Sequence, residues 1–97
     1  MALAFLFEIP GYTEVQQDQI IEHLQRGGKT AEGRIFHLDG PMEGGWRILD
    51  VWESQEALNK FFQEALGPAL QELGFVLAQP LQVWSVHNML IGPEHHL

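Results

Sequence analysis

Asp50 and two histidines are the side chains whose type and position could support chemistry in this chain. Asp50 lies within an otherwise apolar segment, and so do His37 and His87. A carboxylate on an apolar face is costly unless it is paired, whereas an imidazole titrates near neutral pH and binds transition metals. These residues could therefore form one of three kinds of site: a structural ion pair, an acid–base site, or a metal or haem site.

For Asp50 we favour the structural ion pair. If a hairpin closes with Leu38 opposite Trp46, then Arg34 lies opposite Asp50. A cross-strand ion pair would account for both charged residues within an apolar sheet. The alternative is that Asp50 serves as an acid or base inside a pocket.

The two histidines are not expected to bind a metal together within one subunit. If His37 and His87 lie on opposite edge strands of a four-stranded sheet, three strand spacings of about 4.8 Å separate them by roughly 14 Å. Across a dimer the two could meet, but we favour a local hydrogen bond for each. We therefore predict no metal and no cofactor, although haem ligation by either histidine stays open.

A second group of residues could line a ligand cavity. Trp and Asn supply N–H donors on hydrophobic walls, and Tyr and His add titratable groups. The predicted ligand-binding residues are Tyr12, Trp46, Phe61, Trp84, His87 and Asn88. No residue is assigned as catalytic, but His87, Asn88 and Trp46 are the candidates, because they combine a titratable group with N–H donors. For any single Trp we favour a role in the core or in a dimer interface.

The elements that would position these residues follow from apolar periodicity. Alternation with a period of two predicts strands over residues 3–9, 34–38, 46–52 and 81–88, with a loop over 39–45. Helical spacing predicts helices over residues 14–25 and 55–66, followed by a short helical turn over 67–73. Thr13 and Gln16 have capping-box spacing, and Ser54 is a predicted N-cap.

This order of elements is typical of the ferredoxin-like split motif. Strand, helix, strand, strand, helix, strand predicts an α+β fold with a four-stranded antiparallel sheet in the order four, one, three, two. Helices should cover one face of that sheet. We expect one domain over residues 1–90 and a C-terminal tail over 91–97 that contains His95 and His96.

Composition indicates which partners to expect. The chain has 97 residues, no cysteine and a net charge of −8, so it should repel nucleic acid and anionic membranes. We see no export signal or spanning segment and expect a cytoplasmic protein. Because 45% of the residues are apolar and the strands are apolar on both faces, we predict a homodimer joined through its sheets.

Four segments of the chain resemble a known group of proteins. These are 44–54 (GGWRILDVWES), Phe61-Phe62, 67–70 (GPAL) and 86–90 (VHNML). They resemble small bacterial proteins of the dimeric α/β-barrel superfamily, which also contains the antibiotic-biosynthesis monooxygenase-like domains. The resemblance covers roughly residues 2–90. It implies that two ferredoxin-like sheets pack face to face, with a ligand pocket between each sheet and its own helices.

Two hypotheses about function remain from the sequence. The first is a homodimeric protein that binds a small apolar or aromatic molecule, with no activity assigned. The alternative, which the resemblance also implies, is a cofactor-independent monooxygenase-like enzyme that acts on a small aromatic substrate. The two differ in whether a polar donor and a titratable group converge inside one apolar cavity.

Overall fold

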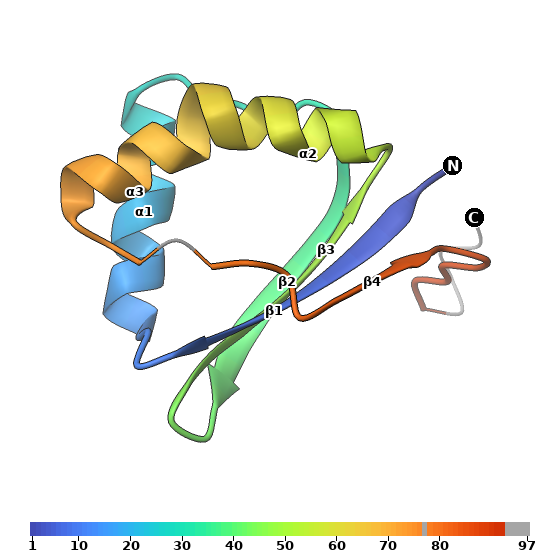
Figure 1. Cartoon of the computed structure of the whole chain (residues 1–97), viewed down its shortest axis with the longest axis horizontal. Helices are drawn as coiled ribbons and strands as arrows, with labels where there is room; N and C mark the ends of the chain where they lie inside the picture. The colour runs from blue at the N-terminus through green and yellow to red at the C-terminus, as the bar shows by residue number, and fades with distance from the viewer. Residues whose placement is uncertain (77, 93–97) are drawn as a thin grey trace.

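The computed structural model describes residues 1–76 and 78–92, and it has the predicted α+β, ferredoxin-like architecture (Figure 1). The elements in chain order are β1 (Leu3–Pro10), α1 (Glu14–Arg26), β2 (Arg34–Met42), β3 (Gly45–Trp52), α2 (Gln55–Phe61), the π-helical turn η1 (Phe62–Leu66), α3 (Gly67–Leu73) and β4 (Gln82–Ser85). The sheet order is β2-β3-β1-β4 with antiparallel neighbours, which confirms the predicted topology. The helices lie on one side of the sheet.

The helix starts are formed by the side chains that the sequence predicts. The Thr13 side chain accepts a hydrogen bond from the Gln16 backbone N–H, and the Gln16 side chain accepts one from the Thr13 backbone N–H. The Ser54 hydroxyl accepts from the Ala57 N–H at the start of α2. These caps satisfy backbone donors that have no partner within the helix. They fix where α1 and α2 begin.

The β2–β3 hairpin is longer than predicted. Pairing continues to Met42 opposite Gly45, so only Glu43 and Gly44 remain as the loop, with Gly44 at φ 76°. The predicted loop over 39–45 is therefore wrong. Pro41, which lacks a backbone N–H, is tolerated within β2 because this strand lies at the edge of the sheet.

The register of the hairpin differs from the predicted one. The two-residue loop places Met42 opposite Gly45, and the unbroken pairing that follows brings His37, not Arg34, opposite Asp50. The prediction that Asp50 pairs with Arg34 is therefore wrong. Beyond this point a β-bulge interrupts the pairing: Phe36 pairs with Val51 and Arg34 with Trp52, so Ile35 is an extra residue without a partner.

The second helical segment runs without interruption through the predicted break at Gly67-Pro68. The helix does not end there, but its hydrogen-bonding pattern changes over η1. In this turn the Gly67 N–H bonds to the Phe62 carbonyl, five residues back. Pro68 has no N–H, and its ring would collide with the carbonyl of Glu64 in a regular helix. The π-helical turn accommodates this conflict, and α3 then ends at Gly74, at φ 70°.

The last strand is shorter than predicted, since β4 covers only Gln82–Ser85. Residues 93–97 of the predicted tail, including His95 and His96, lie outside the described residues. Among the described helices, none combines the length and the hydropathy that crossing a membrane requires.

The core lies between the sheet and the helices. Two fully buried aromatic residues, Trp52 and Phe5, form its centre on β3 and β1. On the other sheet face, cross-strand register aligns a set of apolar residues that no helix covers. This set, called the open-face patch below, consists of Leu6, Phe36, Leu38, Leu49 and Trp84.

Candidate functional site

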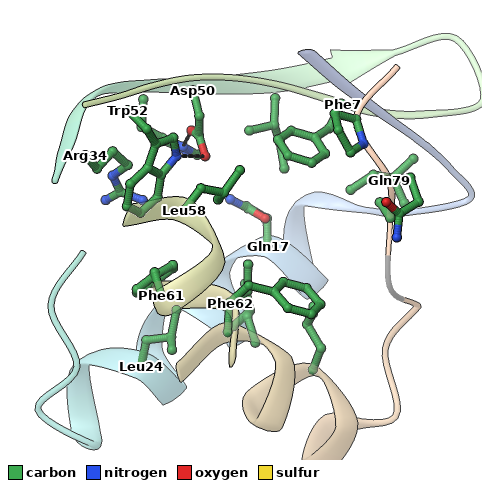
Figure 2. Close-up of a pocket in the computed structure, with 18 of the residues that line it drawn as sticks. Phe7, Gln17, Leu24, Arg34, Asp50, Trp52, Leu58, Phe61, Phe62 and Gln79 are labelled. Atoms are coloured by element: carbon green, nitrogen blue, oxygen red, sulfur yellow. Dashed lines mark hydrogen bonds and ion pairs between the residues drawn. The ribbon is translucent and has the colours of Figure 1, made fainter. Parts of the chain in front are cut away.

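A cavity of about 590 Å³ separates the sheet from its helices (Figure 2). Phe7 and Ile48 line it from the sheet, Phe62 and Leu70 from the helices, and Ala78 from the segment before β4. Small-molecule sites typically occupy ~300–1,000 Å³ and are mostly apolar with a few placed polar groups. The size and lining of this cavity are therefore those of a binding site for a small molecule.

One wall of the cavity carries a buried carboxylate, Asp50, which is only 8% exposed. Its Oδ1 lies 2.5 Å from Nδ1 of His37 on β2. Its Oδ2 accepts a hydrogen bond from Nε1 of Trp52 at 3.3 Å. Both carboxylate oxygens therefore have a partner, which offsets the cost of burying this charge.

The polar chain continues from His37 towards the helices. Nε2 of His37 lies 2.5 Å from Oδ2 of Asp39, two residues along β2. The same oxygen accepts a hydrogen bond from Nε2 of Gln17 on α1, at 3.1 Å. The chain Trp52–Asp50–His37–Asp39–Gln17, called the polar chain below, therefore links β3 through β2 to α1.

The geometry of the polar chain favours a protonated His37. Both ring nitrogens face carboxylate oxygens, which accept hydrogen bonds, so both nitrogens donate in the imidazolium form. The hydrogen bond to Asp50 raises the pKa of His37, burial opposes this, and the bond to Asp39 raises the pKa further. The imidazolium thus bridges two carboxylates in the cavity wall.

This arrangement predicts that stability depends on the protonation of His37. A pKa raised above 6.5 in the folded state contributes stability that is fully present below the unfolded value and is lost as the pH rises through the folded value. We expect the NMR titration of the His37 ring to have a midpoint above 6.5. We also expect the free energy of unfolding to fall between pH 6 and the alkaline side of that midpoint. In a His37→Gln variant this part of the pH dependence should vanish, and a midpoint at or below 6.5 would contradict the bridge.

Tyr12 adds a further polar group to the cavity. It follows β1, lines the cavity, and is buried against Ile9 and Trp46. Burial, with a smaller contribution from the charge of Asp39, raises the pKa of Tyr12 to about 12. Its hydroxyl therefore stays protonated near neutral pH and can donate to a ligand.

The predicted ligand-binding residues divide into two groups. Tyr12 and Phe61 line the cavity, and Trp46 packs beside Tyr12 outside the lining. Trp46 Nε1 is buried without a hydrogen-bond partner among the described residues. The others, Trp84, His87 and Asn88, are exposed on or after β4 and do not line the cavity.

Sequence reasoning did not connect the residues of the polar chain to one another. His37 and Asp39 are two positions apart on a strand, a spacing that places both on one face. This spacing is visible in the sequence, but the contact with Asp50 depends on the length of the hairpin loop, which sets His37 opposite Asp50. Among the described residues, no group of three or more histidine or acidic side chains is arranged so that it could hold a metal ion.

Comparison with known proteins identifies the fold. No family model and no curated protein matches the sequence. Among solved structures, a variant of SnoaB from Streptomyces nogalater, described as a cofactor-independent oxygenase, aligns over 92% of this chain and 96% of its own with a TM-score of 0.61 and 10% identity. A candidate antibiotic-biosynthesis monooxygenase from Deinococcus radiodurans aligns over 94% and 97% with a TM-score of 0.58 and 12% identity.

A third structure, the structural-genomics protein YjcS, aligns over 90% of this chain and 97% of its own, with a TM-score of 0.54 and 17% identity. Each of the three structures aligns with this chain over nearly its whole length. The chain therefore has the same fold as these three structures.

Proposed function

We propose that the protein is a homodimer that binds a small, largely apolar molecule in the cavity between its sheet and its helices. The observation that carries this proposal is the 590 Å³ cavity with apolar walls and the polar chain along one side. Apolar walls supply affinity through burial, and a few fixed polar groups orient the ligand. Residues 1–90 act in this proposal as one domain.

A second candidate function is cofactor-independent oxygenation of a small aromatic substrate. The contact between His37 and Asp50 supports it, because a carboxylate that orients an imidazole is a common acid–base arrangement. The fold shared with SnoaB, which is described as a cofactor-independent oxygenase, supports it as well. If the contact with Asp39 opened and Nε2 of His37 lost its proton to solvent, the neutral imidazole would have a lone pair on Nε2 that could accept a phenolic proton.

The hydrogen bonding of His37 in the structure favours a binding function over oxygenation. Both nitrogens of His37 are occupied, so the imidazole has no free lone pair with which to act as a base. The two hypotheses, a binding protein and an oxygenase, are distinguished by measuring dioxygen consumption when the protein is mixed with 1,5-dihydroxynaphthalene, an electron-rich phenol. Uptake that a His37→Gln variant abolishes would favour the enzyme, and binding without uptake favours the binding protein.

The homodimer part of the proposal rests on the open-face patch. Leu38 is 49% exposed and Trp84 44% exposed, and the register aligns them with apolar neighbours on β1 and β3. Pairing two copies face to face would remove this apolar area from water and would also shelter the edge strands. An obligate interface of this kind buries roughly 2,000 Å² or more in total.

Filling the cavity tests the binding proposal directly. Ile48 lines the cavity from β3 and is only partly buried, so Ile48→Trp should place an indole in the ligand space. We expect 2-naphthol, measured by isothermal titration calorimetry, to bind the variant at least about tenfold more weakly, which corresponds to ~1.4 kcal/mol.

Val15→Trp is the matched control, because Val15 is 65% exposed on α1 and does not line the cavity. Circular dichroism would show that both variants remain folded. Equal affinity of 2-naphthol for the Ile48→Trp and Val15→Trp variants would place the binding site elsewhere.

A further inference from the structure

Arg34 lines the same cavity and makes no ion pair among the described residues. The other two arginines are paired, Arg26 with Glu22 and Arg47 with Glu8. The chain contains thirteen acidic residues against five basic ones, so an acidic partner for Arg34 would be easy to supply. Arg34 is exposed at the cavity, so its guanidinium is open to solvent and to a ligand.

The bulge in β2 is what brings Arg34 to the cavity. Strict alternation along β2 would place Arg34 on the face of Phe36 and Leu38, which belong to the open-face patch. The extra residue, Ile35, reverses the alternation, so Arg34 shares the cavity face with His37. Figure 2 shows Arg34 beside Trp52 at one end of the cavity, with Phe7 and Gln79 at the other.

Two amide side chains of the cavity lining still have donors to offer. Gln55 and Asn59 on α2 line the cavity with Arg34, and Gln55 Nε2 donates to Asn59 Oδ1 at 3.0 Å. That bond uses the Asn59 oxygen and leaves the Asn59 amide hydrogens available. The cavity lining therefore combines a cation with free N–H groups.

The acidic groups of the cavity, in contrast, are already compensated. Asp50 accepts from His37 and Trp52, and Asp39 accepts from His37 and Gln17. The His37 imidazolium donates to both carboxylates, so neither of them depends on Arg34 for a hydrogen bond. Of the charged side chains that line the cavity in the described part of the chain, Arg34 is the one without an ion pair.

We propose that the cavity takes a small carboxylic acid, with its apolar body against the aromatic walls and its carboxylate on Arg34 and the Asn59 amide. This inference rests on the proposed binding function and specifies its ligand class. A guanidinium presents parallel N–H donors that match the two oxygens of a carboxylate, and such charge-assisted bonds are roughly twice as strong as neutral ones. The apolar body of the ligand would contact the other residues that line the cavity.

Two probes that share a naphthalene ring separate the contribution of the carboxylate to affinity from that of the apolar ring. We choose 2-naphthylacetate, which is ionised at neutral pH, and the neutral 2-(2-naphthyl)ethanol, and measure both dissociation constants by calorimetry at low salt. The acid should bind the unmodified protein at least about tenfold more tightly than the alcohol. Arg34→Gln should abolish that advantage and leave the affinity for the alcohol unchanged, and Arg34→Lys should retain part of it.

Arg26→Gln is the matched control, because it removes one positive charge from an exposed pair on α1. It should leave the affinities for both probes unchanged. If the alcohol binds as tightly as the acid, or if Arg34→Gln keeps the advantage of the acid, the carboxylate proposal fails while binding in the cavity stands. If neither probe binds, the proposed binding function and the carboxylate proposal both fail.

Discussion

Replacement of Asp50 by alanine is expected to lower the free energy of unfolding by about 3 kcal/mol, since it removes one partner of a buried charge pair. Asp50 accepts hydrogen bonds from both His37 and Trp52, and Trp52 is fully buried. The variant would leave the Trp52 N–H without its acceptor and His37 with a single carboxylate. Urea unfolding at pH 7 measures the change.

Asp18→Ala serves as the control for the Asp50 variant. Asp18 is exposed on α1 and makes no side-chain hydrogen bond or ion pair among the described residues. Its replacement should change stability by less than about 0.5 kcal/mol. If the two variants proved equally stable, Asp50 would not hold the polar chain together.

Leu38→Glu is expected to convert the proposed dimer into a monomer. Leu38 lies in the open-face patch, on edge strand β2, and is 49% exposed, so the single chain tolerates a charge there. In a dimer related by a two-fold axis, each interface would contain two such carboxylates without partners, at a cost of several kcal/mol. Sedimentation at micromolar concentration should give about twice the 11.0 kDa chain mass for the unmodified protein and about 11.0 kDa for the variant.

Val15→Glu provides the comparison for Leu38→Glu, because Val15 is exposed on α1, away from the sheet. This variant should sediment like the unmodified protein. A mass of 11.0 kDa for the unmodified protein at that concentration would refute the dimer. A variant Leu38→Glu that still sediments at twice this mass would place the interface on another surface.

Much of the fold was predictable from local patterns. Apolar alternation in β1 and β3, the capping box at Thr13 and the N-cap at Ser54 are interactions between residues close in sequence, so the sequence displays them directly. The order of these elements then leaves few topologies that have short, right-handed connections. The observed sheet order β2-β3-β1-β4 is the one predicted.

The candidate site was less predictable, as Arg34, His37 and Asp50 illustrate. The register assumed from the sequence paired Arg34 with Asp50, whereas the two-residue loop sets His37 opposite Asp50 and the bulge at Ile35 then turns Arg34 to the cavity face. Periodicity does not reveal a bulge, because one inserted residue is stabilised by cross-strand hydrogen bonds and packing and not by its own neighbours in sequence. A slip of one residue then moves every later side chain to the other face.

The sequence by itself determined that this chain forms a ferredoxin-like sheet with helices on one face, because apolar periodicity and helix caps are local properties. Only the tertiary structure decided which polar residues meet in the cavity. Gln17, Asp39 and Asp50 come from α1, β2 and β3, and the bonds that join them through His37 span up to 22 residues of sequence. Such contacts form only when strand register and helix packing bring distant segments together, and both depend on the whole core.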